Sequence, residues 1–196
     1  MPADKQTGGL ILTPTDTNAS PQRSIIEAYL RDSGFIGDRL GASRPDAFLV
    51  GDGFLQLITF MGCSPHIELT PPAHGGSFCH VRLRGPYPSP RLLYGRNTLP
   101  PSCGQCRKRL PQWREHLADW ARSPAAADVL CPHCGHRQRP LDLNWKRSAG
   151  AGRLFVQVED VFPGEAVPVA GFMRGLAQAG GVEWAYFYVQ DESDPG

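Results

Sequence analysis

Residues 152–190 read GRLFVQVEDVFPGEAVPVAGFMRGLAQAGGVEWAYFYVQ, and their pattern indicates the fold class. Near the start, Leu154, Val156 and Val158 alternate with other residues, as in a strand with one buried face. Apolar residues then recur at helical spacing up to Gly180–Gly181, which ends the predicted helix. The final VEWAYFYVQ is apolar on both sides and predicts a second strand. Short joins between these elements predict a right-handed crossover, with the last strand parallel inside a sheet.

The N-terminal half adds a helix from about Pro21 to Ser33. Its apolar face consists of Ile25, Ile26, Tyr29 and Leu30. Ser24 and Glu27 have the spacing of a capping box. Gly34 followed by Phe35 is typical of a left-handed helix end with a hydrophobic contact.

Three strands are predicted next. AFLVGDGFLQLITFMG, residues 47–62, indicates two strands around a Gly-Asp-Gly turn, and the second, Phe54 to Met61, has the pattern of a central strand. SFCHVRL, residues 77–83, alternates, with Cys79, Val81 and Leu83 on one face.

These elements predict an α+β fold, a mixed sheet of four or five strands with two helices, in a ferredoxin-like arrangement. Residues 1–20 show no periodicity and are expected to be a flexible tail. The α+β domain is assigned to residues 21–101 and 148–191. Residues 102–147 are assigned to an insertion that interrupts it.

That insertion contains two cysteine pairs, CGQC at 103–106 and CPHCGH at 131–136. The full pattern is C-x2-C-x24-C-x2-C, which predicts four thiolates around one tetrahedral structural Zn²⁺ ion. The expected metal ligands are Cys103, Cys106, Cys131 and Cys134. Gly135 supplies the positive φ that such a turn needs.

At these residues the chain resembles the zinc-ribbon family. The resemblance covers only residues 103–136 or so, and it implies two knuckles on β-hairpins that hold one structural zinc. Arg107 follows Cys106 where the second pair has a glycine, so we expect a less regular first knuckle. His133 and His136 are alternative ligands, although a solvent-facing position is the more ordinary expectation for both.

Between the pairs, LPQWREHLADWARSP predicts an amphipathic helix with Pro111 in its first turn. Its apolar face consists of Leu110, Trp113, Leu117 and Trp120. One interpretation is that this face packs the insertion onto the main domain. The other is that Trp113 and Trp120 form an exposed patch for a protein partner, which would make the chain an adaptor.

Basic residues cluster around the cysteines. The chain has a net charge of +1, but ten Lys or Arg against four Asp or Glu fall between Cys103 and Arg153, and one Arg against seven acids follows. The two parts face each other, or both are solvated, or the basic one binds phosphates through charge and bidentate hydrogen bonds. Cations beside the knuckles also offset the negative charge of a four-thiolate zinc. The leading hypothesis is contact with nucleic acid or a nucleic-acid machine through Arg107, Lys108, Arg109, Arg137, Arg139, Lys146 and Arg147.

Evidence for a reaction is weak. Cys63 and His66, oriented by Glu68, form a candidate nucleophile and base, and a second metal site from Cys63, His66, Cys79 and His80 is a further alternative. Cys79 is expected to be a buried thiol. The chain has no phosphate-binding GxxxxGK, no nucleophile elbow and no HExxH. An enzyme is therefore the less favoured interpretation, and no small-molecule substrate is evident.

Neither a secretory signal nor a membrane span is predicted. The longest apolar stretch, FLQLITFMGC, is about half the length that a span requires. Four of the six cysteines lie in CxxC pairs, which in a reducing compartment indicates metal binding rather than disulfides. Arg makes up 17 of the 20 basic residues, which indicates a GC-rich bacterial gene. We expect a cytoplasmic protein that works by binding.

Overall fold

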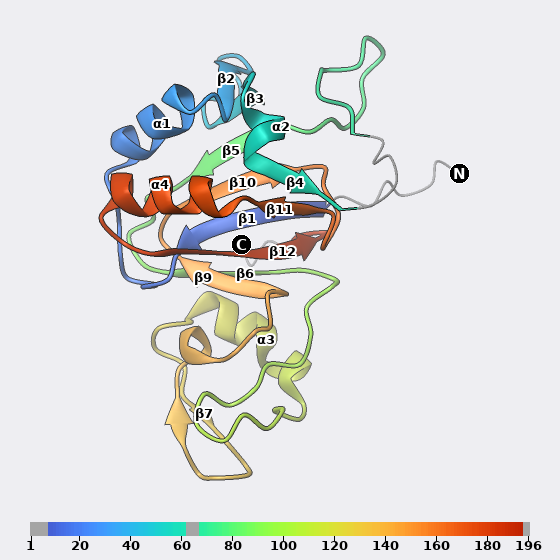
Figure 1. Ribbon diagram of the computed structural model, residues 1–196. Coiled ribbons are helices and arrows are strands. Elements are labelled where there is room, and N and C mark those ends of the chain that lie inside the picture. Colours follow the sequence, from blue (N-terminus) through green and yellow to red (C-terminus); the bar gives the residue numbers. More distant parts are fainter. Residues whose placement is uncertain (1–7, 62–66, 194–196) are drawn as a thin grey trace.

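A six-stranded antiparallel sheet forms the centre of the protein (Figure 1). The structure, a computed structural model, describes residues 8–61 and 67–193. The strand order is β12-β1-β10-β5-β3-β2, and each neighbouring pair is antiparallel. The strands are β1 (Gly8–Pro14), β2 (Ile36–Arg39), β3 (Ala47–Val50), β5 (Val81–Arg84), β10 (Phe155–Glu159) and β12 (Trp184–Gln190).

Two helices, α1 (Arg23–Asp32) and α4 (Ala170–Gly180), cover one face of this sheet (Figure 1). They pack against each other and bury the main hydrophobic core between themselves and the strands. The predicted end of α1 is confirmed, since Gly34 has a φ of 72° and the Phe35 N–H donates to the Leu30 carbonyl at 2.9 Å. The prediction of a capping box at Ser24 and Glu27 is wrong. Gln22 is the N-cap residue, and Glu27 pairs with Arg39 instead.

A second layer covers part of the opposite face. It is a two-stranded sheet of β6 (Arg91–Tyr94) and β9 (Ala149–Gly152). Ile11, Leu93, Phe155, Phe187 and Val189 form a small core between the two layers. This layer carries the polypeptide between β6 and β9, which extends away from the sheet in Figure 1.

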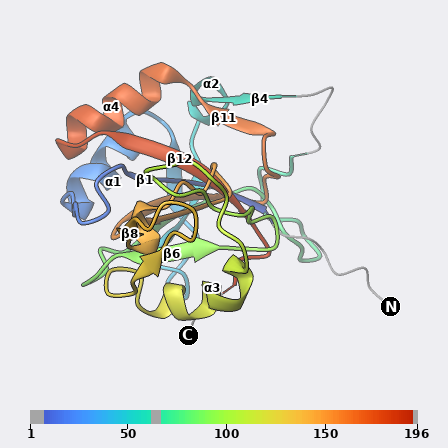
Figure 2. The same cartoon turned by 90° about the horizontal axis from the view of Figure 1, so that it is seen from below.

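Residues 95–148, between β6 and β9, form a module with its own core. The module contains α3 (Trp113–Arg122), β7 (Val129–Leu130), β8 (Arg137–Gln138) and a 3₁₀ turn, Pro140–Asp142. Figure 2, a view from this end of the molecule, shows α3 next to β6, with which it is in contact. Leu92, Ala149 and Ala151 of the β6–β9 layer belong to the same core as the apolar face of α3. The module is therefore anchored through β6 and β9.

The prediction of a flexible tail over residues 1–20 is wrong for residues 8–14. These residues form β1, the second strand of the sheet, and every one of them is buried. Leu10 and Leu12 face the helices, whereas Ile11 faces the β6–β9 layer. A strand buried on both faces shows no alternation, and its partners β10 and β12 lie more than 140 residues away in the sequence. Residues 1–7 lie outside the described part of the chain.

Two strand assignments are also wrong. Phe54–Leu57 is the short helix α2, and only β4 (Ile58–Phe60) is extended, paired with β11 (Ala166–Pro168) outside the main sheet. β12 lies at the sheet edge, antiparallel to β1, rather than parallel inside the sheet. β10 and β12 are parallel to each other, but β1 lies between them and provides the backbone partners for both.

The α+β class is confirmed, with six strands rather than four or five. The order β12-β1-β10-β5, with α1 following β1 and α4 preceding β12, is that of a split β-α-β pair. A ferredoxin-like arrangement and the predicted limits of the insertion stay predictions. Within residues 8–61 and 67–193, no helix combines the length and apolar character that crossing a membrane requires.

The placement of β1 can be tested with Ile11→Ala. Ile11 is fully buried between the sheet and the β6–β9 layer, so we expect the free energy of unfolding to fall by about 2–4 kcal/mol. Ile25→Ala is the matched control, because Ile25 is 46 % exposed on α1, and its effect should stay within about 0.5 kcal/mol. Urea denaturation measures both. Equal, small effects would contradict the buried strand.

Candidate metal centre

The two cysteine pairs converge. The Sγ atoms of Cys103, Cys106, Cys131 and Cys134 all lie within 4.8 Å of one another. The Sγ–Sγ distance is 3.9 Å from Cys103 to Cys134 and 3.7 Å from Cys106 to Cys131. A tetrahedron with metal–sulfur bonds of about 2.3 Å has edges of about 3.8 Å, whereas a disulfide needs about 2.05 Å. The arrangement therefore fits one tetrahedral metal ion held by four thiolates.

Each cysteine pair lies in a backbone turn, and the two turns have the same hydrogen-bond pattern. The Arg107 N–H donates to the Cys103 carbonyl at 3.0 Å, and the Gly135 N–H donates to the Cys131 carbonyl at 2.9 Å. In each pair, the N–H of the first cysteine donates to the carbonyl five residues later, at 2.9 Å. Arg107 has a φ of 60° and Gly135 a φ of 71°. The prediction of a less regular first knuckle is wrong, because Arg107 adopts the left-handed conformation that glycine adopts in the other.

Each turn joins two antiparallel segments. β7 and β8 pair on either side of the second knuckle, and Ser102 bridges to Arg109 on either side of the first. Cys103 and Cys131, the first cysteines of the pairs, are 1 % exposed. Cys106 is half-buried and Cys134 is exposed. The site is therefore enclosed by the module on one side and faces solvent on the other.

Gln138 connects the two knuckles, a role that the sequence did not suggest. It lies on β8 with its side chain buried, and its Oε1 accepts a hydrogen bond from the Gly104 N–H at 3.0 Å. Its Nε2 has no hydrogen-bond partner among the described residues, and the amide favours the thiolate form of Cys103. The only sequence signal was the position itself, four residues after Cys134 on the strand that leaves the knuckle.

Without a metal, the four thiols differ in acidity. The backbone N–H of Cys106, followed by weaker contributions from Gln105 and Gln138, lowers the pKa of Cys103 to about 6. The backbone of His136 favours the Cys134 thiolate, but desolvation and the three neighbouring sulfurs outweigh it and raise the pKa of Cys134 to about 12. Four thiolates at these distances repel one another unless a cation lies between them. Because the thiols must lose their protons to bind a metal, metal binding should weaken at low pH.

The aromatic face of α3 is buried beside the cysteines. Leu110, Trp113, Leu117 and Trp120 are between 4 % and 8 % exposed. Trp145 meets Trp113 and Trp120 edge to face, at centroid distances of 6.4 and 6.3 Å. The packing interpretation of this helix is confirmed, and the exposed Trp113/Trp120 patch for a protein partner is wrong. The helix begins at Trp113, after Pro111 rather than with it.

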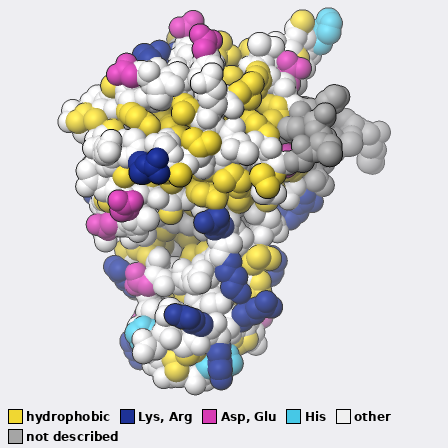
Figure 3. All heavy atoms as spheres, viewed as in Figure 1, with side chains coloured by type: hydrophobic (Ala, Val, Ile, Leu, Met, Phe, Trp, Pro, Cys, Tyr) yellow, Lys and Arg dark blue, Asp and Glu magenta, His cyan; other side chains and the backbone are white. Residues whose placement is uncertain are grey.

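The seven predicted basic residues are all exposed, but they differ in their partners. Arg137 pairs with Asp128, and Arg139 pairs with Asp142 at 2.8 Å. Arg147 lies over the Tyr186 ring and donates to its hydroxyl at 2.7 Å. Within the described part of the chain, five of the seven cations have no ion-pair partner. Apart from Arg147 with its Tyr186 contacts, these are Arg107, Lys108, Arg109 and Lys146. Figure 3 shows Lys and Arg side chains gathered over the module.

The remaining candidates do not form a site that the structure describes. Cys63 and His66 lie outside the described residues. Cys79 is fully buried, as predicted, and desolvation, then Asp160 and Glu159, raise its pKa to about 12, so it is a poor nucleophile. His80 Nδ1 lies 2.9 Å from the Phe78 carbonyl. Over residues 8–61 and 67–193, the four cysteines are the one group of three or more His, Cys, Asp or Glu placed to hold a metal.

Comparison with known proteins identifies no relative. The family models, the curated proteins and the solved structures each give no match. The features that bear on function are therefore the cysteine centre, the surface around it and the module that carries both.

The equivalence of the two knuckles predicts opposite effects of two substitutions. No atom lies within 4 Å of a Cβ placed on Gly135, so Gly135→Ala should lower the free energy of unfolding by about 1 kcal/mol through backbone strain alone. Arg107→Gly should remove such strain and raise it by up to about 1 kcal/mol. Urea denaturation of the metal-loaded protein measures both. A loss of stability in Arg107→Gly larger than that in Gly135→Ala would contradict this.

Proposed function

We propose that Cys103, Cys106, Cys131 and Cys134 hold one structural Zn²⁺ ion, and that the module is a zinc ribbon that presents cations to nucleic acid. The observation that supports the metal site is the set of Sγ distances, which match a sulfur tetrahedron. Four protein thiolates leave no open coordination position, which favours a structural role over a catalytic one. A tetrahedral sulfur site suits zinc or iron, and we choose zinc for its preference for such closed knuckle sites.

The metal would fix a module whose own core is small. The chain between the cysteine pairs contains α3, and that helix buries its aromatic face in the module core. Joining the turn at Cys103–Cys106 to the turn at Cys131–Cys134 closes the ends of this segment. The binding free energy then adds to the folding free energy of the module. A reducing cytoplasm, which keeps the thiols free, is the compartment that this proposal requires.

Metal analysis and removal test this site. We expect one zinc ion per purified chain, and Cys106→Ala should abolish that stoichiometry while Cys79→Ala, at a buried cysteine outside the site, should retain it. Chelation should change the tryptophan fluorescence, because Trp113, Trp120 and Trp145 share the core beside the cysteines. Metal-free protein with the fluorescence of the purified form, or iron in place of zinc, would contradict the proposal.

The case for nucleic acid rests on the unpaired cations. Arg107, Lys108 and Arg109 follow one another on the exposed side of the first knuckle. Among the described acids of the C-terminal part, none forms an ion pair with these three cations, and Glu159 and Glu192 pair with Arg82 and Arg84 of the sheet instead. Exposed cations gain little from ordinary surface pairs, but several that face one phosphate backbone act together through counterion release.

Binding to oligonucleotides at several salt concentrations tests this second part. The double substitution of Lys108 and Arg109 by Ala should weaken binding and reduce the salt slope by about 0.7 to 0.9 for each phosphate that the variant no longer neutralises. Arg174→Ala, which removes a cation from α4 on the other side of the sheet, should leave binding unchanged. The wild-type protein failing to bind DNA and RNA, or binding them independently of salt, would exclude this function.

A further inference from the structure

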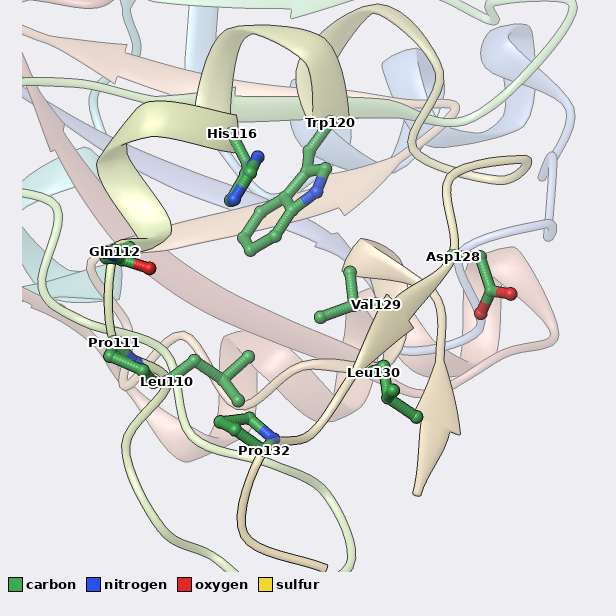
Figure 4. A pocket seen from close by; sticks show the side chains of 9 residues that line it. All are labelled: Leu110, Pro111, Gln112, His116, Trp120, Asp128, Val129, Leu130 and Pro132. Atoms are coloured by element: carbon green, nitrogen blue, oxygen red, sulfur yellow. The ribbon is translucent and has the colours of Figure 1, made fainter. Parts of the chain in front are cut away.

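A groove beside the cysteine centre is lined by aromatic and apolar side chains of the module. It has a volume of about 290 Å³ and lies between α3 and β7 (Figure 4). One wall is aromatic, with the His116 ring stacked on Trp120 at a centroid distance of 5.7 Å and an angle of 23°. Figure 4 shows these two side chains pointing from α3 toward Val129 and Pro132.

The opposite wall consists of Val129 of β7 and Pro132 of the second knuckle, and Figure 4 shows both facing the groove, whereas Leu130 points to the other side of β7. Asp128, which also lines the groove, pairs with Arg137. The amide of Gln112 lies at one end of the groove. An occupant would therefore have flat apolar faces and polar edges.

The chain segment that carries Arg107, Lys108 and Arg109 leads directly into this groove. Arg109 directly precedes Leu110, which lines it, and the Arg109 carbonyl lies 3.2 Å from His133 Nε2 of the second knuckle. The cationic segment of the first knuckle and the apolar wall of the second thus meet at the same place. A polyanion with flat rings along its length matches both features.

Double-stranded DNA fits this surface poorly. The outward side of α3 carries Glu115 and Asp119, so the helix would place carboxylates against the phosphates of a duplex groove. The β7–β8 hairpin has two residues in each strand, which is too short to enter a major groove as a ribbon. A single strand does not impose these limits, because its unstacked bases can enter a pocket one at a time.

We propose that this groove receives one unstacked base of a single-stranded nucleic acid, with the flanking phosphates held by Arg107, Lys108 and Arg109. The proposal rests on the proposed function and narrows it to single strands. The base lies between the His116–Trp120 pair and the Val129 and Pro132 side chains, and the Gln112 amide faces its edge. Stacking of this kind tolerates any base, so a weak sequence preference is expected.

The experiment compares a short fluorescent single-stranded oligonucleotide with a duplex of the same length, by anisotropy, on zinc-loaded protein. Wild-type protein should bind the single strand at least about tenfold more tightly. His116→Ala, at an exposed position, should weaken single-strand binding about tenfold and leave duplex binding unchanged, because it removes the ring stacked on Trp120. His74→Ala is the matched control, because His74 is exposed in the loop before β5 and lies outside the module.

The outcomes separate the two proposals. If neither oligonucleotide binds, the proposed function fails and this inference fails with it. If both bind equally, or if His116→Ala behaves like His74→Ala while the Lys108 and Arg109 double variant weakens binding, the groove is not a base site although the nucleic-acid function is retained. Zinc content of each variant shows whether it is folded, and His116→Gln, which removes the ring and keeps a polar side chain at this exposed position, decides the question should His116→Ala lose its metal.

Discussion

Burial of β1 on both faces holds the two layers of the protein together. Leu10 and Leu12 complete the core under α1 and α4, and Ile11 completes the core under β6 and β9. The same strand supplies backbone partners to β10 and β12. A single segment thereby belongs to both cores, and it fixes where the layer that carries the module can lie.

The contact between the layers is close because β9 is built from small residues. A Cβ on Gly150 would lie 2.4 Å from the Phe187 ring, and one on Gly152 would lie 2.1 Å from the Thr13 hydroxyl. These two glycines let β9 lie directly against β12 and β1. The module that begins and ends at β6 and β9 is then held against the sheet by this close packing and by hydrogen bonds to β12. Asn97 accepts from the Gln190 N–H at 2.7 Å and donates to the Tyr188 carbonyl at 3.0 Å.

Within the module, the tryptophans and the cysteines occupy different positions. Trp113, Trp120 and Trp145 fill the interior, while the four sulfurs close the turns at its far side. Cys103 and Cys131 belong to both groups, since they are buried in the same core. What remains at the surface is a row of unpaired cations beside an aromatic groove, and both lie at the end of the molecule farthest from α1 and α4. A binding role at that end is the interpretation that accounts for both.

Features that depend on local pattern could be predicted from the amino-acid sequence. Each of these features depends on residues that are close together in the sequence: the CxxC pairs, the amphipathic α3 and α4, the end of α1 at Gly34 and the buried face of β10. Long-range packing was needed to show that residues 8–14 are a central strand, that β12 is an edge strand, and that Phe54–Leu57 is helical. It was also needed to show that Arg107 adopts a glycine-like conformation and that Gln138 reaches the first knuckle. The difference arises because periodicity reports which side of a segment is buried, whereas strand pairing and close contacts are set by partners distant in the chain.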